Sequence, residues 1–162
     1  MRRAVVVTAS DGVAAGARED RSGAVVAARL SDLGFVVDQV LVADERAAIG
    51  SALVDAADSH ELVVTTGGTG LTPRDVTPQA TLDVIDYEVP GLAEAMRAAG
   101  RAITPMADLS RAVVGVRRGS LIVNLPGSPK GAIESLAAIE AVLDHALETL
   151  AGPYDHGAGG TS

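Results

Sequence analysis

The stretch LVVTTGGTG, residues 62–70, joins a short run of apolar and β-branched residues to a glycine-rich turn. A continuous run of this kind, without alternation, is typical of a strand that is covered on both faces, and we predict a strand at 62–65. In parallel sheets ligands bind beyond the carboxyl ends of the strands, which is where the turn Gly67-Gly68-Thr69-Gly70 would lie. The stretch therefore predicts a buried parallel strand that leads directly into a candidate ligand site.

Strands and helices alternate on both sides of this stretch. The hydrophobic pattern predicts strands at 4–8, 35–43, 62–65, 112–117 and 121–125, and helices at 22–33, 44–56, 79–85, 92–99 and 128–150. The strand at 112–117 is the one that we consider for an antiparallel direction. We therefore expect a single α/β domain at 1–151, with a mainly parallel sheet and helices on both faces, followed by a flexible glycine-rich tail at 152–162.

The composition excludes several classes of protein. The 162 residues carry 13 Lys and Arg against 21 Asp and Glu, a formal net charge of -8, so we expect no broad binding to nucleic acid, which needs clustered cations. Aromatic residues, at 2%, are too few for base stacking. The lack of cysteine excludes disulfides, thiolate metal sites and cysteine nucleophiles, and it fits the cytoplasm. No apolar run is long enough to span a membrane, and Ser10 and Asp11 interrupt the N-terminal run before a signal peptide is complete.

The glycines of residues 67–70 allow two interpretations. Glycine leaves backbone N–H groups open to a phosphate, because no Cβ stands in the way. The turn is not a P-loop, since no Lys-Ser/Thr pair follows it, and it lacks the last glycine of the dinucleotide-binding fingerprint. A tight turn between a strand and a helix, with no ligand, is the structural alternative.

Four aspartates in the predicted loops are candidates for metal or phosphate chemistry. Asp75 lies in a loop rich in Thr and Pro, where its carboxylate could coordinate a magnesium ion that bridges phosphates; the alternative is a turn residue. Asp44 precedes a predicted helix, and spacing alone favours an N-cap over a ligand. Asp11 and Asp20 are by default solvated turn residues. Thr77, directly before a proline, is expected to cap the next helix.

The segment Pro126-Gly127-Ser128-Pro129-Lys130 leaves a strand and enters the last helix. A helix N-terminus favours anions, and a lysine in its first turn adds to that attraction, so the segment suits a phosphate group. The alternative is plain capping by Ser128, with Lys130 in solvent. Arg74 and Arg111 could strengthen the positive field, although scattered arginines are more often surface residues. The three histidines show no metal spacing, and no G-x-S-x-G motif indicates a serine hydrolase.

Several strings in the sequence are those of a known family. The strings TTGGTG at 65–70, DVTP at 75–78 and NLPGSP at 124–129 resemble the paired signatures of the molybdopterin-binding MoaB/Mog family. Shorter matches are SD at 10–11, EDRSG at 19–23 and VADE at 42–45. The resemblance runs from the first predicted strand through the last helix, and two long motifs in the right order are not expected by chance.

The resemblance implies an α/β domain, usually trimeric, in molybdenum cofactor biosynthesis. The string PRDVTP at 73–78 is more similar to the adenylyltransferase branch, which includes the G domain of gephyrin, than to its sibling branch. That branch joins molybdopterin to AMP from ATP with release of pyrophosphate, using magnesium. Its essential aspartates match Asp44 and Asp75, which the resemblance therefore implies as catalytic residues and metal ligands. One departure is Tyr87, at a position where we expect a basic residue in many members.

The resemblance also implies which residues bind the substrates. They are Ser10, Asp11, Asp20, Ser22, Gly67, Gly68, Thr69, Gly70, Thr77, Ser110, Pro126, Gly127, Ser128 and Lys130. The first hypothesis is a cytoplasmic, homotrimeric molybdopterin adenylyltransferase that uses ATP, molybdopterin and Mg²⁺ and could hand its product to a molybdenum-insertion protein. The second is a non-catalytic molybdopterin-binding or scaffold paralogue. The third, which the paired motifs disfavour, is a general nucleotide-phosphate binder.

Overall fold

The computed structural model describes residues 1–152, so the expected tail lies, from residue 153 onward, outside the described residues. The elements along the chain are β1 (Arg3–Ala9), α1 (Asp11–Ala14), α2 (Arg21–Asp32), β2 (Val36–Val42), α3 (Arg46–Ser59), β3 (Leu62–Thr66), α4 (Thr77–Val84), β4 (Tyr87–Glu88), α5 (Pro90–Arg101), the 3₁₀ helix η1 (Pro105–Leu109), β5 (Val114–Arg117), β6 (Ser120–Leu125) and α6 (Pro129–Ala151).

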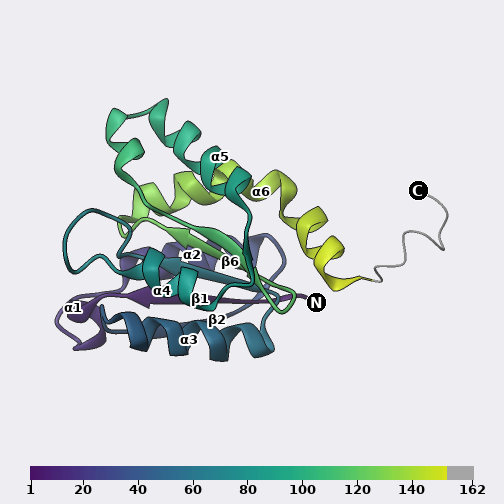
Figure 1. Cartoon of the computed structure of the whole chain (residues 1–162), viewed down its shortest axis with the longest axis horizontal. Coiled ribbons are helices and arrows are strands. Elements are labelled where there is room, and N and C mark those ends of the chain that lie inside the picture. The colour runs from purple at the N-terminus through teal and green to yellow at the C-terminus, as the bar shows by residue number, and fades with distance from the viewer. Residues whose placement is uncertain (153–162) are drawn as a thin grey trace.

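The strands form one sheet in the order β2-β1-β3-β6-β5-β4 (Figure 1). The first four are parallel: Val63 of β3 lies opposite Val5 of β1 on one side and Ile122 of β6 on the other. Strand β5 is antiparallel to β6, and β4 is antiparallel to β5. The mainly parallel sheet is confirmed, and so is the antiparallel direction considered for the strand near 112–117.

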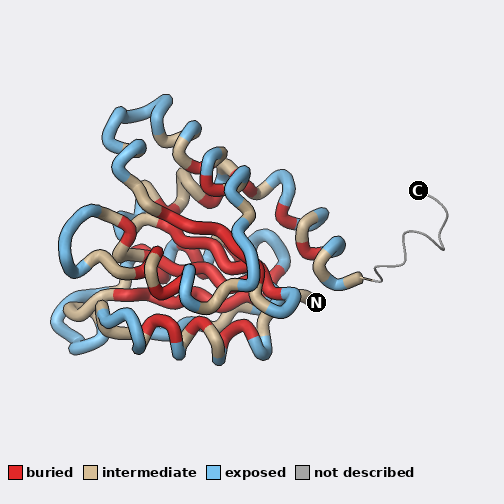
Figure 2. The backbone as a smooth tube through the Cα atoms, in the orientation of Figure 1, coloured by how far each residue is buried: buried red, intermediate tan, exposed pale blue. Residues whose placement is uncertain are grey.

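Helices cover both faces of the sheet, as the sequence predicts. Along β1, Ala4 and Val6 pack with residues of α2, α5 and α6, whereas Val5 and Val7 pack with residues of α3 and α4. In Figure 1, α5 and α6 lie above the sheet and α3 lies below it. Strands β1, β3 and β6 are buried almost throughout (Figure 2), while the edge strand β2 is largely exposed. Because β1, β2, β3 and β6 are parallel, the loops that follow them meet at one edge of the sheet.

Three short elements are not predicted by the sequence pattern. These are α1, β4 and η1, each of five residues or fewer, which is too short for a hydrophobic period to show. Helices α4 and α5 begin two residues earlier than expected, because Pro78 and Pro90 belong to their first turns. The predicted strands and helices are otherwise present with shifts of a few residues at their ends.

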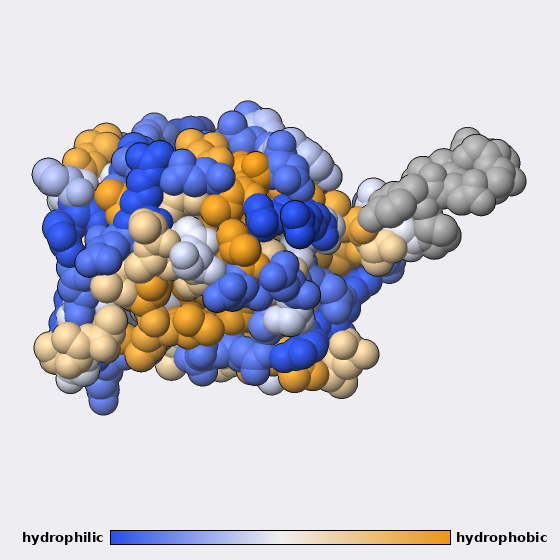
Figure 3. Space-filling model, turned by 60° about the horizontal axis from the view of Figure 1, so that its bottom comes forward, coloured by the Kyte–Doolittle hydropathy of each residue, from blue (hydrophilic) through white to orange (hydrophobic). Residues whose placement is uncertain are grey.

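The surface mixes polar and apolar side chains. Figure 3 shows hydrophobic residues exposed among hydrophilic ones on one face of the molecule. Large apolar side chains that are more than half exposed include Leu71, in the loop after β3, and Ile103 and Met106, next to and within η1. Of the helices within residues 1–152, none is both long and apolar enough to cross a membrane.

Candidate functional site

Two cavities open at the edge of the sheet where the parallel strands end. The polar cavity, of about 800 Å³, is enclosed by the ends of β1 and β3 and by the loops after β1, β2 and β6. The sequence-predicted residues that line it are Ser10, Asp20, Ser22, Asp44, Gly67, Gly68 and Gly127. The apolar cavity, of about 490 Å³, lies between the loop after β3, α5, η1 and the start of α6. Its sequence-predicted residues are Thr69, Gly70, Ser110, Pro126 and Ser128. The glycine-rich turn therefore forms part of the wall of both cavities.

The glycine-rich turn can take only glycine at its first two positions. Gly67 and Gly68 have φ angles of 94° and 73°, in the left-handed region that side chains avoid. A Cβ on Gly67 would lie 2.6 Å from the Ala9 carbonyl oxygen, and one on Gly68 would lie 2.2 Å from Thr77 Oγ1. The Gly67 N–H donates to the Leu125 carbonyl (3.1 Å), which ties the turn to β6. The tight turn is thus present, and the ligand role of its cavity side stays a prediction.

Asp44 and Asp11 hold each other at the ends of β2 and β1. The backbone N–H of Asp44 donates to Asp11 Oδ1 (2.9 Å), and the backbone N–H of Asp11 donates to Asp44 Oδ2 (3.2 Å). The other oxygen of Asp11 accepts from the Arg74 guanidinium. The bond from the Asp44 backbone, together with Arg74, lowers the pKa of Asp11. Two loops that are distant in sequence are thereby fastened together.

The Asp44 carboxylate has one oxygen that accepts a bond from Asp11 and one oxygen without a partner. Its Oδ1 is buried and has no hydrogen-bond partner. Burial, followed by the negative charges of Asp11 and Asp75, raises the pKa of Asp44 against the opposing effects of the bond from the Asp11 backbone and the positive charge of Arg74. The expected N-cap role is wrong, because α3 begins at Arg46 and its N-cap residue is Glu45. The side chain of Asp44 is therefore turned to the neighbouring loop rather than to its own helix.

Asp75 lies near Asp44 but in a different local setting. Its Oδ2 accepts two bonds from Thr72, one from the backbone N–H (3.0 Å) and one from Oγ1 (2.9 Å). The Asp75 carboxylate lines neither cavity, yet its charge is close enough to contribute to the raised pKa of Asp44. Both aspartates thus lie at the glycine-rich turn, Asp44 beside Gly67 and Gly68 and Asp75 against Gly70, and the bonds to Thr72 confirm the turn interpretation of Asp75.

A series of hydrogen-bonded polar side chains lines the polar cavity. Asp20 Oδ2 accepts from Thr8 Oγ1 (2.8 Å), which in turn accepts from Thr66 Oγ1 (3.2 Å). Asp20 Oδ1 accepts from the Gly23 N–H (2.9 Å) and caps α2. Ser22 Oγ donates to Thr66 Oγ1 (3.3 Å). The default of a solvated turn residue is therefore wrong for Asp20, which caps a helix at the wall of the cavity.

The remaining predicted residues differ in their surroundings. Ser128 caps α6, since its Oγ accepts from the Gly131 N–H (3.1 Å), as expected. Lys130 is 82% exposed, lines neither cavity, and its Nζ lies 3.9 Å from Glu134 Oε1. Thr77 is not the N-cap of α4, because that position is Val76; Thr77 is buried and its Oγ1 has no partner. Tyr87 lies in the edge strand β4 and lines neither cavity.

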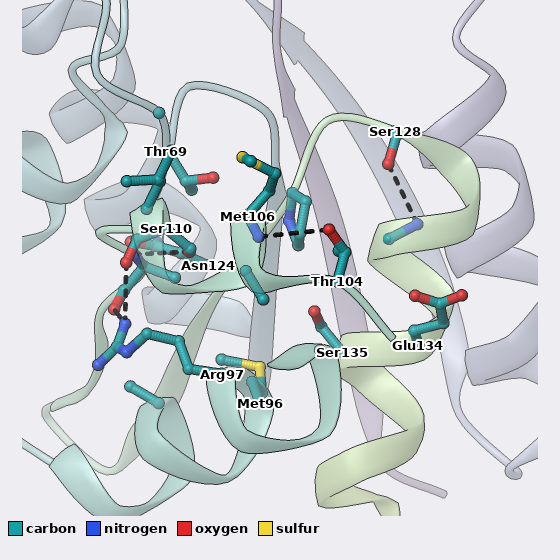
Figure 4. A pocket seen from close by; sticks show the side chains of 18 of the residues that line it. Thr69, Met96, Arg97, Thr104, Met106, Ser110, Asn124, Ser128, Glu134 and Ser135 are labelled. Atoms are coloured by element: carbon teal, nitrogen blue, oxygen red, sulfur yellow. Dashed lines mark hydrogen bonds between the residues drawn. The ribbon is translucent and has the colours of Figure 1, made fainter. Parts of the chain in front are cut away.

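The apolar cavity itself is the feature that sequence reasoning missed (Figure 4). Met96 and Arg97 of α5 and Met106 of η1 line it together with Thr69 and Ser110. The only signal was the apolar spacing of the predicted helix at 92–99, which fits ordinary core packing equally well. The cavity becomes apparent only when η1, which has no sequence pattern, is placed beside the loop after β3.

Asn124, at the end of β6, lies between the sheet and the apolar cavity. Its side chain is fully buried, and its Nδ2 donates to the hydroxyls of Thr65 (3.1 Å) and Thr81 (3.0 Å). Its Oδ1 accepts from the Val113 N–H (3.1 Å). Every polar atom of the amide is satisfied, so Asn124 fixes the segment before β5 against the central strands.

The described residues can supply only part of a metal coordination shell. They contain no group of three or more His, Cys, Asp or Glu side chains placed to hold a metal ion. The donors at hand are carboxylate oxygens, foremost the unpartnered Oδ1 of Asp44. Mg²⁺ is commonly held by one or two carboxylates together with phosphate oxygens of a substrate. The site therefore fits a magnesium ion that arrives with a phosphate ligand, and not a cage built from the protein alone.

Known proteins are similar to this chain in sequence and fold. Residues 5–145 match the family model described as "Probable molybdopterin binding domain". A molybdenum cofactor biosynthesis bifunctional protein of Synechococcus elongatus is 44% identical over 95% of this chain, which spans about half (49%) of that protein. The molybdopterin adenylyltransferase of Helicobacter pylori is 40% identical over 92% of this chain and 88% of its own length. The structure of the molybdopterin biosynthesis enzyme MoaB from Thermus thermophilus is 48% identical, with a TM-score of 0.86 over 96% of this chain and 100% of that one.

Proposed function

Since this chain belongs to the family of probable molybdopterin-binding domains, we propose that it is a molybdopterin adenylyltransferase of molybdenum cofactor biosynthesis. It transfers AMP from ATP to molybdopterin and releases pyrophosphate. The observation that carries the proposal is the position of both aspartates at the glycine-rich turn, since Asp44 lines the polar cavity with Gly67 and Gly68 and the Asp75 carboxylate lies against Gly70. The adenylyltransferase of Helicobacter pylori, at 40% identity, supports the choice of reaction.

The two cavities provide room for two substrates side by side. The glycine-rich turn separates them, with Gly67 and Gly68 on the polar cavity and Thr69 and Gly70 on the apolar cavity. Backbone N–H groups of the turn and the N-terminus of α6 attract phosphate groups. The sequence-predicted ligand residues that line the two cavities are proposed to contact molybdopterin and ATP there, whereas Asp11, Thr77 and Lys130 line neither cavity and are proposed to act from beside them. A ligand bound to each cavity would bring its phosphates to the shared turn.

The reaction is a displacement at the α-phosphorus of ATP. The terminal phosphate of molybdopterin forms the new P–O bond, and the bond to pyrophosphate breaks. No covalent intermediate with a side chain is needed, so the protein acts by position and electrostatics. Asp44 and Asp75 would hold Mg²⁺ on the phosphates. The ion supplies positive charge that neutralises the departing pyrophosphate, which matters in a chain with a net charge of -8.

Assembly and location complete the proposal. We propose a homotrimer in the cytoplasm that passes its product to a molybdenum-insertion protein. Large exposed apolar residues near the apolar cavity, among them Leu71, Ile103 and Met106, support a covered surface in the assembly. The many small Ala and Val side chains would allow subunits to approach closely.

The test is formation of adenylated molybdopterin from purified components. The protein is incubated with molybdopterin, ATP and Mg²⁺, and the adenylated pterin and pyrophosphate are measured by mass spectrometry. We expect both products, in equal amounts, and only when all three ligands are present. Tight binding of molybdopterin without product would favour the second candidate, a binding or scaffold protein. ATP hydrolysis that does not require molybdopterin would favour a general nucleotide-phosphate binder.

A further inference from the structure

Arg111 is joined by three hydrogen bonds to the loop that carries Asp75 and by a fourth to the helix α4 that follows it. Its Nε donates to the Gly70 carbonyl (2.8 Å) and its Nη2 donates to the Asp75 carbonyl (2.7 Å). Its Nη1 donates to Gln79 Oε1 (3.2 Å), and its backbone N–H donates to the Thr69 carbonyl (2.9 Å). One edge of the guanidinium thus holds both ends of the segment 70–75.

The bonds within the loop do not attach it to the domain. Thr72 bonds to the Asp75 carboxylate, and the Asp75 N–H donates to the Thr72 carbonyl (3.0 Å), so these contacts fix only the internal shape of the loop. Arg111 comes from a segment almost forty residues further along the chain, directly before β5. It is therefore a long-range anchor of this loop, and it grips the loop at the residue that bears the carboxylate.

The anchor is itself held in place. The carbonyls on either side of it, those of Ser110 and Ala112, accept bonds from Arg97 Nη1 (3.3 and 3.1 Å). The next residue, Val113, donates its N–H to the buried Asn124 (3.1 Å). The backbone of Arg111 is thus fixed against α5 and β6. Its side chain, through the bonds to the carbonyls of Gly70 and Asp75, holds the loop in a fixed place relative to these two elements.

The surroundings of Arg111 distinguish an anchor from a ligand for phosphate. The guanidinium is partly buried, it lines neither cavity, and it forms no ion pair among the described residues. Its three bonded nitrogens all face neutral oxygens of the fold. A planar guanidinium can bond two carbonyls in parallel, whereas a lysine ammonium is a point charge and cannot reproduce that fork.

We propose that Arg111 is a positioning residue, which sets the place of the Asp75 carboxylate relative to Asp44 through its grip on the carbonyls of Gly70 and Asp75. The proposal rests on the proposed function for its catalytic consequence, although the anchoring itself does not depend on it. A misplacement of about 1 Å at a reacting site can lower a rate by ~10²-fold, so loss of the anchor should be expressed mainly in kcat.

The experiment compares Arg111→Ala, Arg111→Lys and the control Arg117→Ala. Arg117 is a matched control because its Nη1 also donates to a backbone carbonyl, that of Val84 (2.8 Å), but at the far end of α4. Hydrogen exchange of the amides at 70–76 is measured without ligand, and kcat and KM are measured for adenylated molybdopterin formation. We expect Arg111→Ala to raise exchange at 70–76 by about tenfold and to lower kcat by about 10- to 100-fold, with KM changed by less than about threefold. Arg111→Lys should resemble the alanine variant, and Arg117→Ala should keep the parental kcat.

The double variant with Asp75→Asn separates positioning from general support of the fold. If Arg111 acts through Asp75, Arg111→Ala should lower the residual rate of Asp75→Asn by less than about threefold. Additive losses, a full rescue by lysine, or an equal loss in Arg117→Ala would each overturn the proposal. A parent protein that forms no adenylated molybdopterin would contradict the proposed function instead. Hydrogen exchange would then decide the anchoring alone, and unchanged exchange at 70–76 in Arg111→Ala would refute it.

Discussion

Gly70→Ala is expected to displace the Asp75 carboxylate without unfolding the protein. A Cβ added at Gly70 would lie 2.8 Å from Asp75 Oδ2, whereas ordinary contact begins at 3.4 Å. The carboxylate therefore has to withdraw by about 0.6 Å, a step that lengthens its bonds to Thr72. Because the clash involves the end of a side chain and Gly70 does not have a positive φ, the free energy of unfolding should change by less than about 1 kcal/mol.

The rate should respond far more than the stability. If a displacement of about 1 Å costs ~10²-fold, a displacement of about 0.6 Å should lower kcat by roughly 10- to 30-fold. The assay is the initial rate of adenylated molybdopterin formation at saturating ATP and molybdopterin, with the melting temperature measured in parallel. Gly91→Ala is the control, because a Cβ there meets no atom within 4 Å. It should keep the parental rate.

Two measurements on Gly70→Ala decide whether the position of the Asp75 carboxylate controls the rate. A crystal structure of Gly70→Ala with the carboxylate of Asp75 displaced, together with a kcat within twofold of the parent, would mean that the position of this carboxylate does not matter. A drop in rate that Gly91→Ala shares would point to a general effect of alanine on the helices and loops.

The charges of Asp44 and Lys130 and the state of assembly can each be tested separately. Burial raises the pKa of Asp44, so its protonated form is favoured by the fold, and the stability that this contributes is lost as the pH rises above the ordinary value of 3.8. The melting temperature of ligand-free Asp44→Asn minus that of the parent should therefore increase as the pH rises. A difference between the two melting temperatures that is independent of pH would contradict this. Lys130→Glu places a negative charge at the start of α6 and should weaken binding of molybdopterin or ATP at low salt, whereas unchanged affinity for both would leave Lys130 a solvent-exposed residue. Sedimentation at micromolar concentration should give a trimer, and a monomer would refute that part of the proposal.

The central sheet was predictable because its signals are local and strong. The runs at 4–8, 62–65 and 121–125 are continuous and mostly apolar, and they form the buried strands β1, β3 and β6. The two helix-covered faces follow from strands of this kind alternating with amphipathic helices. The family resemblance is confirmed as well, through the match over residues 5–145.

The N-cap residues of the helices were harder to predict from the sequence, because capping depends on the angle at which the chain enters a helix. Asp44 has the right residue type one position too early, and its side chain bonds across to Asp11 instead. Asp20 was not expected to cap, yet it bonds both Gly23 and Thr8. Ser128 was predicted correctly, since the proline after it fixes the first turn of α6.

The site was only partly predictable, because its parts come from segments that are distant in sequence. The motifs indicated the glycine-rich turn and the loop before α6, and the structure places both in the wall of two cavities. The apolar cavity depends on α5 and η1, which lie outside those motifs. In the sequence, Arg111 is an isolated cation, and its bonds to Gly70 and Asp75 become apparent only in the folded chain. The roles of Asp44 and Asp75 in catalysis stay predictions.

The most direct test of the account is the rate of adenylated molybdopterin formation by Asp75→Asn beside that of the parent. The substitution keeps the size of the side chain and removes its charge, so the variant should fold and bind molybdopterin like the parent. Loss of one well-placed electrostatic contact typically lowers a rate by ~10²–10³-fold, and we expect at least that loss here. A folded Asp75→Asn protein that forms adenylated molybdopterin within a fewfold of the parental rate would contradict the account.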